Sequence, residues 1–340
     1  MRRRKRPAVL SVVGLGFVAL FIVWLGYNLV NDPTNFFNIF LIGLTQGSVY
    51  ALVALGYTLV YGILQLINFA HGDVFALTGL VASSLIVSTF NLDETSSALM
   101  IVGGLGATFL IAMVFGATVN ATIELVAYRR LRNAPRLAVL ITAVGMSFIV
   151  QNISLAFFDV NFRSVPSLVP DSDVFRIGGV HYSWQALFVV LVTAPVLVIL
   201  RWLVQHTRQG KAMRATAQDP EASAMMGINV NRTISFTFLL AGALAGIGAV
   251  LFLVEFNVRY DTGFELGLIA FTAAVLGGIG NLYGAVLGAL IIGMVQAFNE
   301  GPFPLATKSD WTRSLVFGIL IAILVFRPEG LLGERTPEGA

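Results

Sequence analysis

The sequence predicts an all-α membrane protein, a polytopic bundle of about ten membrane-spanning helices, with eight or nine spans as alternatives. Of the 340 residues, 57% are hydrophobic and only 11% are charged, whereas soluble domains carry about 25% charged residues. The apolar residues gather in runs of about 20, the length that a helix needs to cross a ~30 Å hydrocarbon core. Basic residues flank these runs instead of forming one patch, so the net charge of +3 does not indicate nucleic-acid binding.

Nine apolar segments qualify as spans. The eighth contains several glycines around Gly280 and is expected to form two shorter helices that meet near Asn281, which brings the number to ten. The segments are 8–30, 36–67, 72–90, 98–127, 137–158, 184–204, 233–255, 265–298 and 312–327. The first follows a basic start and would also suit a signal peptide. However, it is longer than a signal's apolar region and no Ala-x-Ala cleavage site follows, which favours a first transmembrane helix.

Lys and Arg accumulate in cytoplasmic loops, so they predict the orientation of the chain. With the N-terminus inside, 16 of the 21 basic residues fall on the cytoplasmic side. They lie at the N-terminus, around Arg130, between Arg201 and Arg232, and in the C-terminal tail. Both termini are therefore expected in the cytoplasm, and the segment 159–183 is expected outside.

One face of the helix predicted over 36–67 is small or polar. At 100° per residue, eight residues fall within an arc of about 100°: Gly43, Gln46, Tyr50, Ala54, Tyr57, Tyr61, Gln65 and Asn68. The opposite side is formed by leucine and isoleucine. Unpaired polar groups are costly in lipid, so the polar face should contact protein or water. It is expected to line a substrate pathway, and a helix buried in the bundle is the alternative.

The stretch from Asn68 to Asp73 places an amide and two ionisable groups between two apolar runs. Ionisable residues inside a membrane are candidate functional groups. If Gly72 interrupts the helix, Asp73 is expected to cap the next one, where free N–H groups attract a carboxylate. His71 and Asp73 then belong to the substrate pathway. A tight cytoplasmic turn with both side chains in water is the alternative, and both interpretations stay open.

Two glycine pairs indicate a weak internal repeat. Gly43 and Gly47 open one span, and Gly242 and Gly246 open another that the basic residues predict to run in the opposite direction. This relationship is typical of inverted-repeat transporters. The alternative is that small residues four apart serve helix packing only.

Two acidic residues near the ends of spans are expected to have structural roles. Glu124 lies one turn from Tyr128 and near Arg129, which favours a pair at the membrane interface. Glu255 precedes Arg259 by four residues, a spacing that suits an ion pair at a helix end.

The longest loop predicted inside the cell, about 206–232, is amphipathic. Asp219 suits a helix cap, Pro220 the first helical position and Gly227 a terminator, so a short helix is predicted over 220–227. Such a helix suits docking onto a soluble partner, and a helix lying on lipid headgroups is the alternative.

The sequence excludes several classes of chemistry. It has no cysteine, and its three histidines are scattered, so no metal site is expected. No catalytic residue is expected either, because His-Glu-x-x-His and Gly-x-Ser-x-Gly motifs are absent. Gly210-Lys211 lacks the upstream glycine and the following hydroxyl of a nucleotide-binding phosphate loop. No cofactor is therefore expected on this chain, and the energy for transport must come from another subunit or an ion gradient.

Several stretches resemble known transport proteins. Glu221-Ala222-Ser223, followed by Gly227, is similar to the coupling motif of bacterial ATP-binding cassette (ABC) importer permeases, although the downstream Ile-x-Leu-Pro part is absent. Four longer stretches resemble LivH-type permeases of branched-chain amino acid importers and spread over about residues 36–335. They are GLTQGSVYALVALGYTLVYGILQLINFAHGDVFALTG, GKAMRATAQDPEASAMMGINVNR, AVLGGIGNLYGAVLGALIIG and FRPEGLLG.

The resemblance implies a division of the chain into a basic N-terminus with an extra helix (1–35), a permease domain (36–330) and a cytoplasmic tail (331–340). It implies that the loop at 206–232 contacts an ATPase subunit. The residues expected to couple the two are Gly210, Lys211, Arg214, Asp219, Glu221, Ala222 and Gly227.

The family further implies a second related permease subunit, two cytoplasmic ATPases that bind the ATP, and an external solute-binding protein, assembled in a bacterial cytoplasmic membrane. The expected solutes are branched-chain or other small amino acids. Urea or short amides are one alternative. Another is an ion-coupled secondary transporter in which His71 and Asp73 relay protons.

Overall fold

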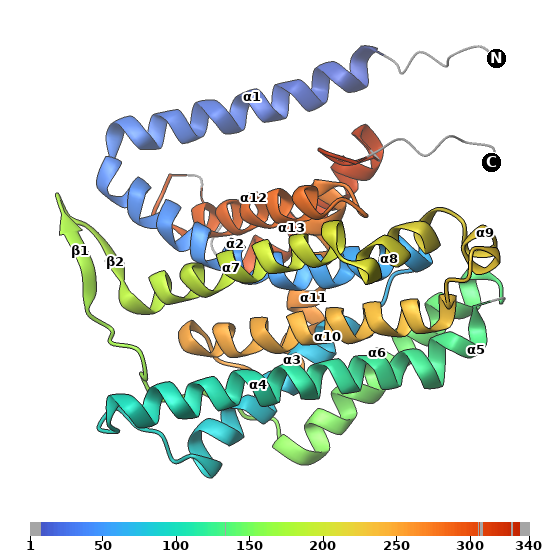
Figure 1. Cartoon of the computed structure of the whole chain (residues 1–340). Coiled ribbons are helices and arrows are strands. Elements are labelled where there is room, and N and C mark those ends of the chain that lie inside the picture. The colour runs from blue at the N-terminus through green and yellow to red at the C-terminus, as the bar shows by residue number, and fades with distance from the viewer. Residues whose placement is uncertain (1–7, 133, 305, 307–308, 328, 334–340) are drawn as a thin grey trace.

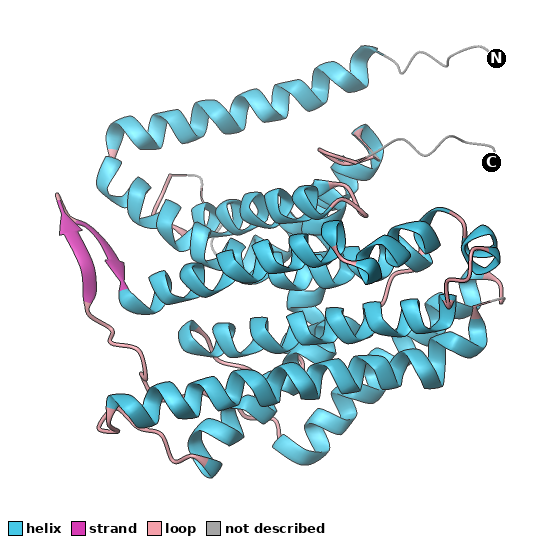
Figure 2. Cartoon of the chain, viewed as in Figure 1, coloured by secondary structure: helices cyan, strands magenta, loops and turns pink. Residues whose placement is uncertain are grey.

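The computed structural model describes residues 8–333, apart from 133, 305, 307–308 and 328. The basic cluster at 2–6 and Arg335 of the tail lie outside the described residues. Helices dominate the fold, and most of the long ones lie side by side in one bundle (Figures 1 and 2). The helices are α1 (Ala8–Asn31), α2 (Pro33–Leu64), α3 (Ala70–Ser84), α4 (Ala98–Ile123), α5 (Arg129–Leu131), α6 (Arg136–Phe158), α7 (Trp184–His206), α8 (Arg208–Gln218), α9 (Pro220–Met225), α10 (Val230–Glu255), α11 (Thr262–Gly277), α12 (Leu282–Glu300) and α13 (Ser309–Phe326). π-Helical turns continue α3 over Leu85–Thr89 and α4 over Glu124–Tyr128.

Apolar helices occupy every position that the sequence predicts for a span. Within the described part of the chain, seven are long and apolar enough to cross a membrane, and three more are shorter: Ala19–Asn31, Thr262–Gly277 and Trp311–Phe326. The predicted break near Asn281 is also present, because the Asn281 side chain accepts the N–H groups of Tyr283 and Gly284 and starts α12. The positions of the helices are thus confirmed, whereas the count of ten spans stays a prediction.

Three helices, α2, α3 and α10, form the centre of the bundle, and α4, α6 and α7 lie outside them. In their most apolar windows, 72–78% of the residues of the central helices are buried, against 17–28% in the outer ones. The outer helices expose large apolar side chains such as Leu99, Phe157 and Val198. A surface of this kind suits lipid rather than water.

The all-α prediction needs one correction, a β-hairpin before α7 made of β1 (Asp173–Ile177) and β2 (Val180–Ser183), which pair antiparallel. Its turn residues, Gly178 and Gly179, both have positive φ, which is the geometry of a tight hairpin turn. The hairpin is tied to the start of α2, where Asn38 accepts the N–H of His181 at 2.9 Å. It projects from one end of the bundle (Figure 2).

Helices α2 and α10 make equivalent contacts through their glycine pairs. A β-carbon on Gly43 or Gly47 would lie 2.8 Å from a Cα of α12, that of Met294 or Leu290. A β-carbon on Gly242 or Gly246 would collide with the backbone of α4. In both cases the absence of a side chain lets two antiparallel helices approach closely.

The contacts around α3 show that α2 and α10 run in opposite directions. Near the middle of α10, Gly248 touches both Leu52 of α2 and Phe75 of α3. Closer to the start of α10, Phe238 is joined through Asn120 to Asn68, which precedes α3. Helix α3 therefore runs parallel to α10 and antiparallel to α2. Opposite directions combined with equivalent glycine contacts are the arrangement expected of an inverted repeat.

Candidate functional site at the start of helix α3

The chain reverses direction between α2 and α3 through five residues without regular helix, 65–69. Helix α2 ends at Leu64, where Gln65 adopts φ +52° and donates its backbone N–H to Tyr61. Helix α3 begins at Ala70 without a side-chain cap. The interruption lies at 65–69 and not at Gly72, which is inside α3. Asp73 therefore lies in the first turn of α3, and its predicted role as helix cap is wrong.

The reversal brings the start of α3 back to the inside of the bundle. His71 contacts Gly56, which lies eight residues before the end of α2, a distance of about 12 Å along a helix. His71 and Asp73 are both fully buried, at 0% exposure. The residues are thus enclosed by protein and not in a turn that faces water. Non-helical backbone at such depth requires protein or a cavity around it.

The start of α11 meets the start of α3 at the same level. Gly72 and Gly263 touch through their backbones, each occupying the place where a β-carbon of the other would lie, and Gly267 also packs against Gly72. Phe69, just before α3, lies near Phe271, further along α11. The two helices therefore overlap side by side near their N-terminal ends and run in opposite directions. Their two N-terminal ends, which carry partial positive charge, therefore lie close together.

Asp73 is held by α6. Its carboxylate accepts a hydrogen bond from the Gln151 amide at 3.0 Å and a short one from the Ser147 hydroxyl. Ser147 and Gln151 are four residues apart on one face of α6. Among the described residues, this buried carboxylate has two neutral donors and no cationic partner. Such an arrangement is uncommon and costly, so we regard Asp73 as a candidate functional group.

A second polar cluster surrounds Asn68. Its side chain donates to Asn120 at 3.2 Å and accepts from the Tyr128 hydroxyl at 2.9 Å. Asn120 in turn donates to the backbone carbonyl of Phe238 at 2.7 Å. The cluster joins the segment before α3 to α4 and α10, and every side chain in it is buried and hydrogen-bonded.

His71 is the exception among these polar groups. Neither nitrogen of its imidazole forms a hydrogen bond of ordinary geometry in the described structure, although the Val53 carbonyl lies close to the ring. The ring lies edge-on to Tyr57, with ring centroids 5.0 Å apart. A buried polar side chain without a partner costs free energy, so its retention needs an explanation such as a ligand or a second conformation.

The predicted polar face of α2 is mostly inside the protein. Gln46, Tyr50 and Tyr57 are buried, with the Tyr50 hydroxyl donating to Gln296 of α12 at 2.9 Å. Tyr61 is half-buried and Gln65 is exposed. The stripe therefore does not form one continuous surface; its contact with a substrate stays a prediction.

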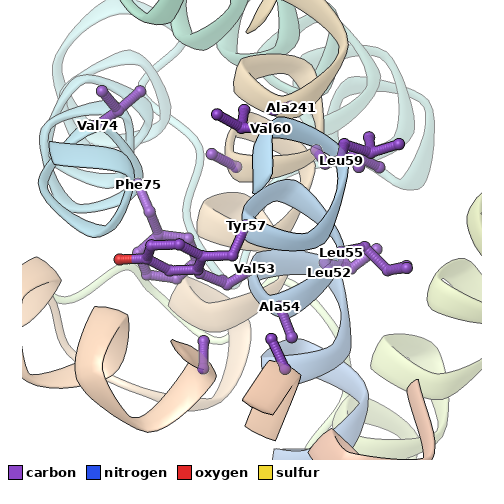
Figure 3. Packing of buried hydrophobic residues seen from close by; sticks show 14 of the residues in the cluster. Leu52, Val53, Ala54, Leu55, Tyr57, Leu59, Val60, Val74, Phe75 and Ala241 are labelled. Carbon is purple, nitrogen blue, oxygen red and sulfur yellow. The ribbon is translucent and has the colours of Figure 1, made fainter. Parts of the chain in front are cut away.

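The side of α2 opposite the polar face, which the sequence pattern predicts to be apolar, is buried as well. Leu52, Leu55 and Leu59 are at most 6% exposed. Figure 3 shows them leaving α2 on the side opposite Tyr57, which points toward α3. Helix α2 is thus surrounded by protein over its central turns.

Sequence reasoning missed the partners on other helices: Asn120, Tyr128, Ser147 and Gln151. A signal existed for two of them, because Ser147 and Gln151 share one face of an otherwise apolar span. Nothing in the sequence pairs that face with Asp73.

The loop between α7 and α10 contains two helices, α8 and α9. The expected coupling residues divide into two groups there. Gly210 packs against the backbone of Leu203 and Val204 at the end of α7, and the Arg214 guanidinium donates to the Val204 carbonyl. These two residues fix α8 to the span before it. Lys211 is exposed.

Helix α9 begins as the sequence predicts. The Asp219 carboxylate accepts the N–H of Ala222 at 2.9 Å, and Pro220 is the first helical residue. The helix ends at Met225, two residues before Gly227, whose φ of +83° terminates it.

Helix α9 exposes an apolar tip that was not predicted. Met225 and Met226 are 82% and 83% exposed, next to the exposed Glu221. Adjacent exposed methionines are typical of surfaces that bind another protein.

The structure confirms one of the two predicted ion pairs, that of Glu124, and contradicts the other, that of Glu255. Glu124 is fully buried and forms ion pairs with Arg129 and Arg132, and it also accepts from Ser235 of α10, so the pair with Arg129 is confirmed. The predicted pair of Glu255 and Arg259 is wrong, because Arg259 binds Asp261 at 2.6 Å. The loop after α10 turns the guanidinium toward the nearer carboxylate.

Comparison with known proteins identifies relatives along most of the chain. Residues 39–325 match the family described as branched-chain amino acid transport system / permease component. The permease protein BraD of a high-affinity branched-chain amino acid transport system of Pseudomonas aeruginosa is 40% identical over 300 residues, which is 87% of this chain and 95% of BraD. LivH of Escherichia coli K12, a permease protein of such a system, is 35% identical over 303 residues, again 87% of this chain and 95% of the relative.

One solved structure, of a metal-chelate type ABC transporter in an inward-facing conformation, matches with a TM-score of 0.46 and 16% sequence identity. The match covers 94% of this chain and 99% of the chain in that structure. The match over residues 39–325 and the identity to BraD and LivH establish that the chain belongs to the family of branched-chain amino acid transport permease components.

Proposed function

We propose that the chain imports branched-chain amino acids as the membrane permease subunit of an ABC transporter in the cytoplasmic membrane. The observation that carries this function is the family match over residues 39–325. The 40% identity to BraD, a permease protein of a branched-chain amino acid transport system, supports it. The chain lacks a nucleotide-binding phosphate loop, so ATP hydrolysis falls to a partner ATPase.

The topology that we propose has ten spans with both termini in the cytoplasm. The distribution of basic residues supports it, since the loop with α8 and α9 then lies inside. The β-hairpin before α7 lies outside, on the side from which a solute-binding protein delivers its ligand. A second permease subunit and two ATPases complete the assembly, and α1 is an addition at the edge of the permease domain.

The junction of α3 and α11 is where we place the solute. A free amino acid carries a carboxylate and an ammonium group, which need opposite partners. Two helix starts at Gly72 and Gly263 offer N–H groups and positive potential to the carboxylate. Asp73 offers a carboxylate to the ammonium group, and the His71 nitrogens, which form no hydrogen bond of ordinary geometry in the described structure, lie close by. Movement of α3 relative to α11 would open this region.

Coupling to the ATPase is assigned to α9 in this proposal. Glu221, Met225 and Met226 form an exposed tip, while Gly210 and Arg214 attach α8 to α7. A displacement of α9 would therefore be transmitted to α7 through α8. It would also be transmitted directly to α10 through the short segment 226–229. Rigid attachment at both ends supports transmission of movement into the spans.

The test is uptake of labelled leucine by the assembled transporter in proteoliposomes with internal ATP. The variants Glu221→Lys and Met225→Ser/Met226→Ser should lose most ATP-driven uptake while the permease still folds and inserts. Met100→Ser removes a methionine that is 54% exposed on α4, away from α9, and serves as the matched control. Normal uptake and normal stimulation of ATPase activity in both α9 variants would refute the coupling role.

The same preparation tests the solute. Excess isoleucine or valine should compete with labelled leucine, and excess urea or acetamide should not. Transport of labelled urea without competition from leucine would assign the chain to the alternative solute class.

A further inference from the structure

An open cleft of about 700 Å³ lies beside the first turns of α10, between them and the ends of the α4–α5 and α7–α8 segments. Arg129, Arg232, Asn229 and Asn231 line its polar end, and Phe236 and Leu239 line the other. The cleft is separate from the junction of α3 and α11 and from the exposed tip of α9.

The polar end of the cleft carries excess positive charge. Glu124, the carboxylate behind it, is fully buried and is shared by Arg129 and Arg132, so one negative charge faces two positive ones. Arg232 adds a third guanidinium, and among the described residues this guanidinium has no hydrogen bond or ion pair; only the Arg232 backbone N–H is engaged, donating to the Asn229 side chain at 3.0 Å. None of the described residues that line the cleft is acidic. An anion is the ligand that this end can satisfy.

The cleft changes from polar to apolar along α10. From Asn229 to Leu239 the helix rises about 15 Å, and the lining changes over this distance from arginine and asparagine to phenylalanine and leucine. Leu239 is 39% exposed, so the apolar end is open to the surroundings of the helix. The direction of α10 carries that end toward the centre of the bilayer. A ligand with an anionic head and a hydrocarbon tail matches both ends.

We propose that this cleft binds an anionic phospholipid, with its phosphodiester at Arg232 and Arg129 and an acyl chain along Phe236 and Leu239. Basic pockets between membrane-spanning helices are a recognised setting for anionic headgroups. A zwitterionic lipid is disfavoured, because the described lining offers no carboxylate to its ammonium group. The bound lipid would bridge the end of α4 and the start of α10, the segments that Glu124 also joins.

The test is binding of phosphatidylglycerol to the purified full chain in neutral detergent, followed by native mass spectrometry. Phosphatidylcholine with the same acyl chains and inorganic phosphate are the two comparison ligands. Arg232→Gln should weaken phosphatidylglycerol binding about fivefold, the order of magnitude for one interfacial arginine. Arg130→Gln is the matched control, because Arg130 is an exposed arginine of α5 that does not line the cleft.

Selective binding of phosphatidylglycerol that weakens in Arg232→Gln and persists in Arg130→Gln supports the proposal. Equal binding of phosphatidylcholine, or equal losses in the two variants, would overturn it. Displacement of the lipid by millimolar inorganic phosphate would show a site for a small anion and would refute the lipid. A Leu239→Ser variant tests the apolar end of the cleft. We expect its affinity for phosphatidylglycerol to fall toward that of a short-chain phosphatidylglycerol. An unchanged affinity would contradict contact between Leu239 and an acyl chain.

Discussion

The imidazole of His71 occupies the space in which a side chain at position 56 would begin, so Gly56 and His71 exclude any substitution that adds a β-carbon to α2 at this level. The contact fixes how far the chain folds back before α3 starts. Both nitrogens of His71 lack a hydrogen bond of ordinary geometry in the described structure. The position of the α3 start, and with it Asp73, therefore depends on the smallest residue of the neighbouring helix.

The variant Gly56→Ala should displace His71 and move the start of α3. We expect a loss of stability of about 1–3 kcal/mol from overpacking, together with a severe loss of leucine uptake. Gly62→Ala is the control on the same helix, because its β-carbon would come no closer than 3.9 Å to Gly280. Thermal unfolding in detergent and uptake in proteoliposomes measure the two effects. Equal behaviour of both variants would show that the His71 contact is unimportant.

Removal of the Asp73 carboxylate should impair transport while the protein still folds. In Asp73→Asn, the side chain keeps its size and one acceptor, so we expect the hydrogen bond from Gln151 or Ser147 to survive and the protein to fold. The negative charge proposed for the ammonium group of the solute is lost. Leucine uptake should fall at least tenfold, a ratio that corresponds to roughly 1.4 kcal/mol. Asp93→Asn, in the exposed loop before α4, is the control, and wild-type uptake in Asp73→Asn would exclude Asp73 from solute binding.

Local signals in the sequence located the helices but not the neighbours of each one. The Asp219 cap and the end of α9 before Gly227 depend on residues close together in the chain, and both were predicted. The partners of Asn68 and Asp73 lie 52 to 78 residues away on α4 and α6. Helical periodicity shows which residues share a face, but it does not show which other face they meet.

The burial of both sides of α2 has a related cause. Lipid and the apolar interior of a bundle accept the same side chains, so leucines such as Leu55 do not reveal which of the two surrounds them. The β-hairpin was missed because its two strands are only five and four residues long in a chain dominated by long apolar runs. Its Gly178-Gly179 turn was the available signal.

Two ion pairs of opposite character give a prediction about stability. Glu124 is fully buried beneath Arg129 and Arg132, whereas Glu265 pairs with Arg313 at the surface, where both side chains are largely exposed. Glu124→Gln leaves two partly exposed arginines without a counter-charge, so it should destabilise the protein by about 1–3 kcal/mol, less than the loss of a partner in a fully buried pair. Glu265→Gln should change stability by less than about 1 kcal/mol. Similar unfolding temperatures for the two variants would contradict a structural role for the Glu124 cluster.

Equivalent glycine contacts on α2 and α10 should make the two helices respond alike to substitution. A β-carbon in Gly246→Ala meets the backbone of α4 at Ala112, and one in Gly47→Ala meets the backbone of α12 at Leu290. Backbone cannot move aside as a flexible side chain does, so each variant should lose about 1–3 kcal/mol. Gly145→Ala on α6 is the control: nothing lies within 4 Å of its β-carbon, and replacing glycine inside a helix should be neutral or stabilising by up to about 1 kcal/mol.

Thermal unfolding of the three purified variants measures these changes. A loss at Gly47 without one at Gly246 would show that the two helices are not equivalent, and would remove the main structural support for an inverted repeat.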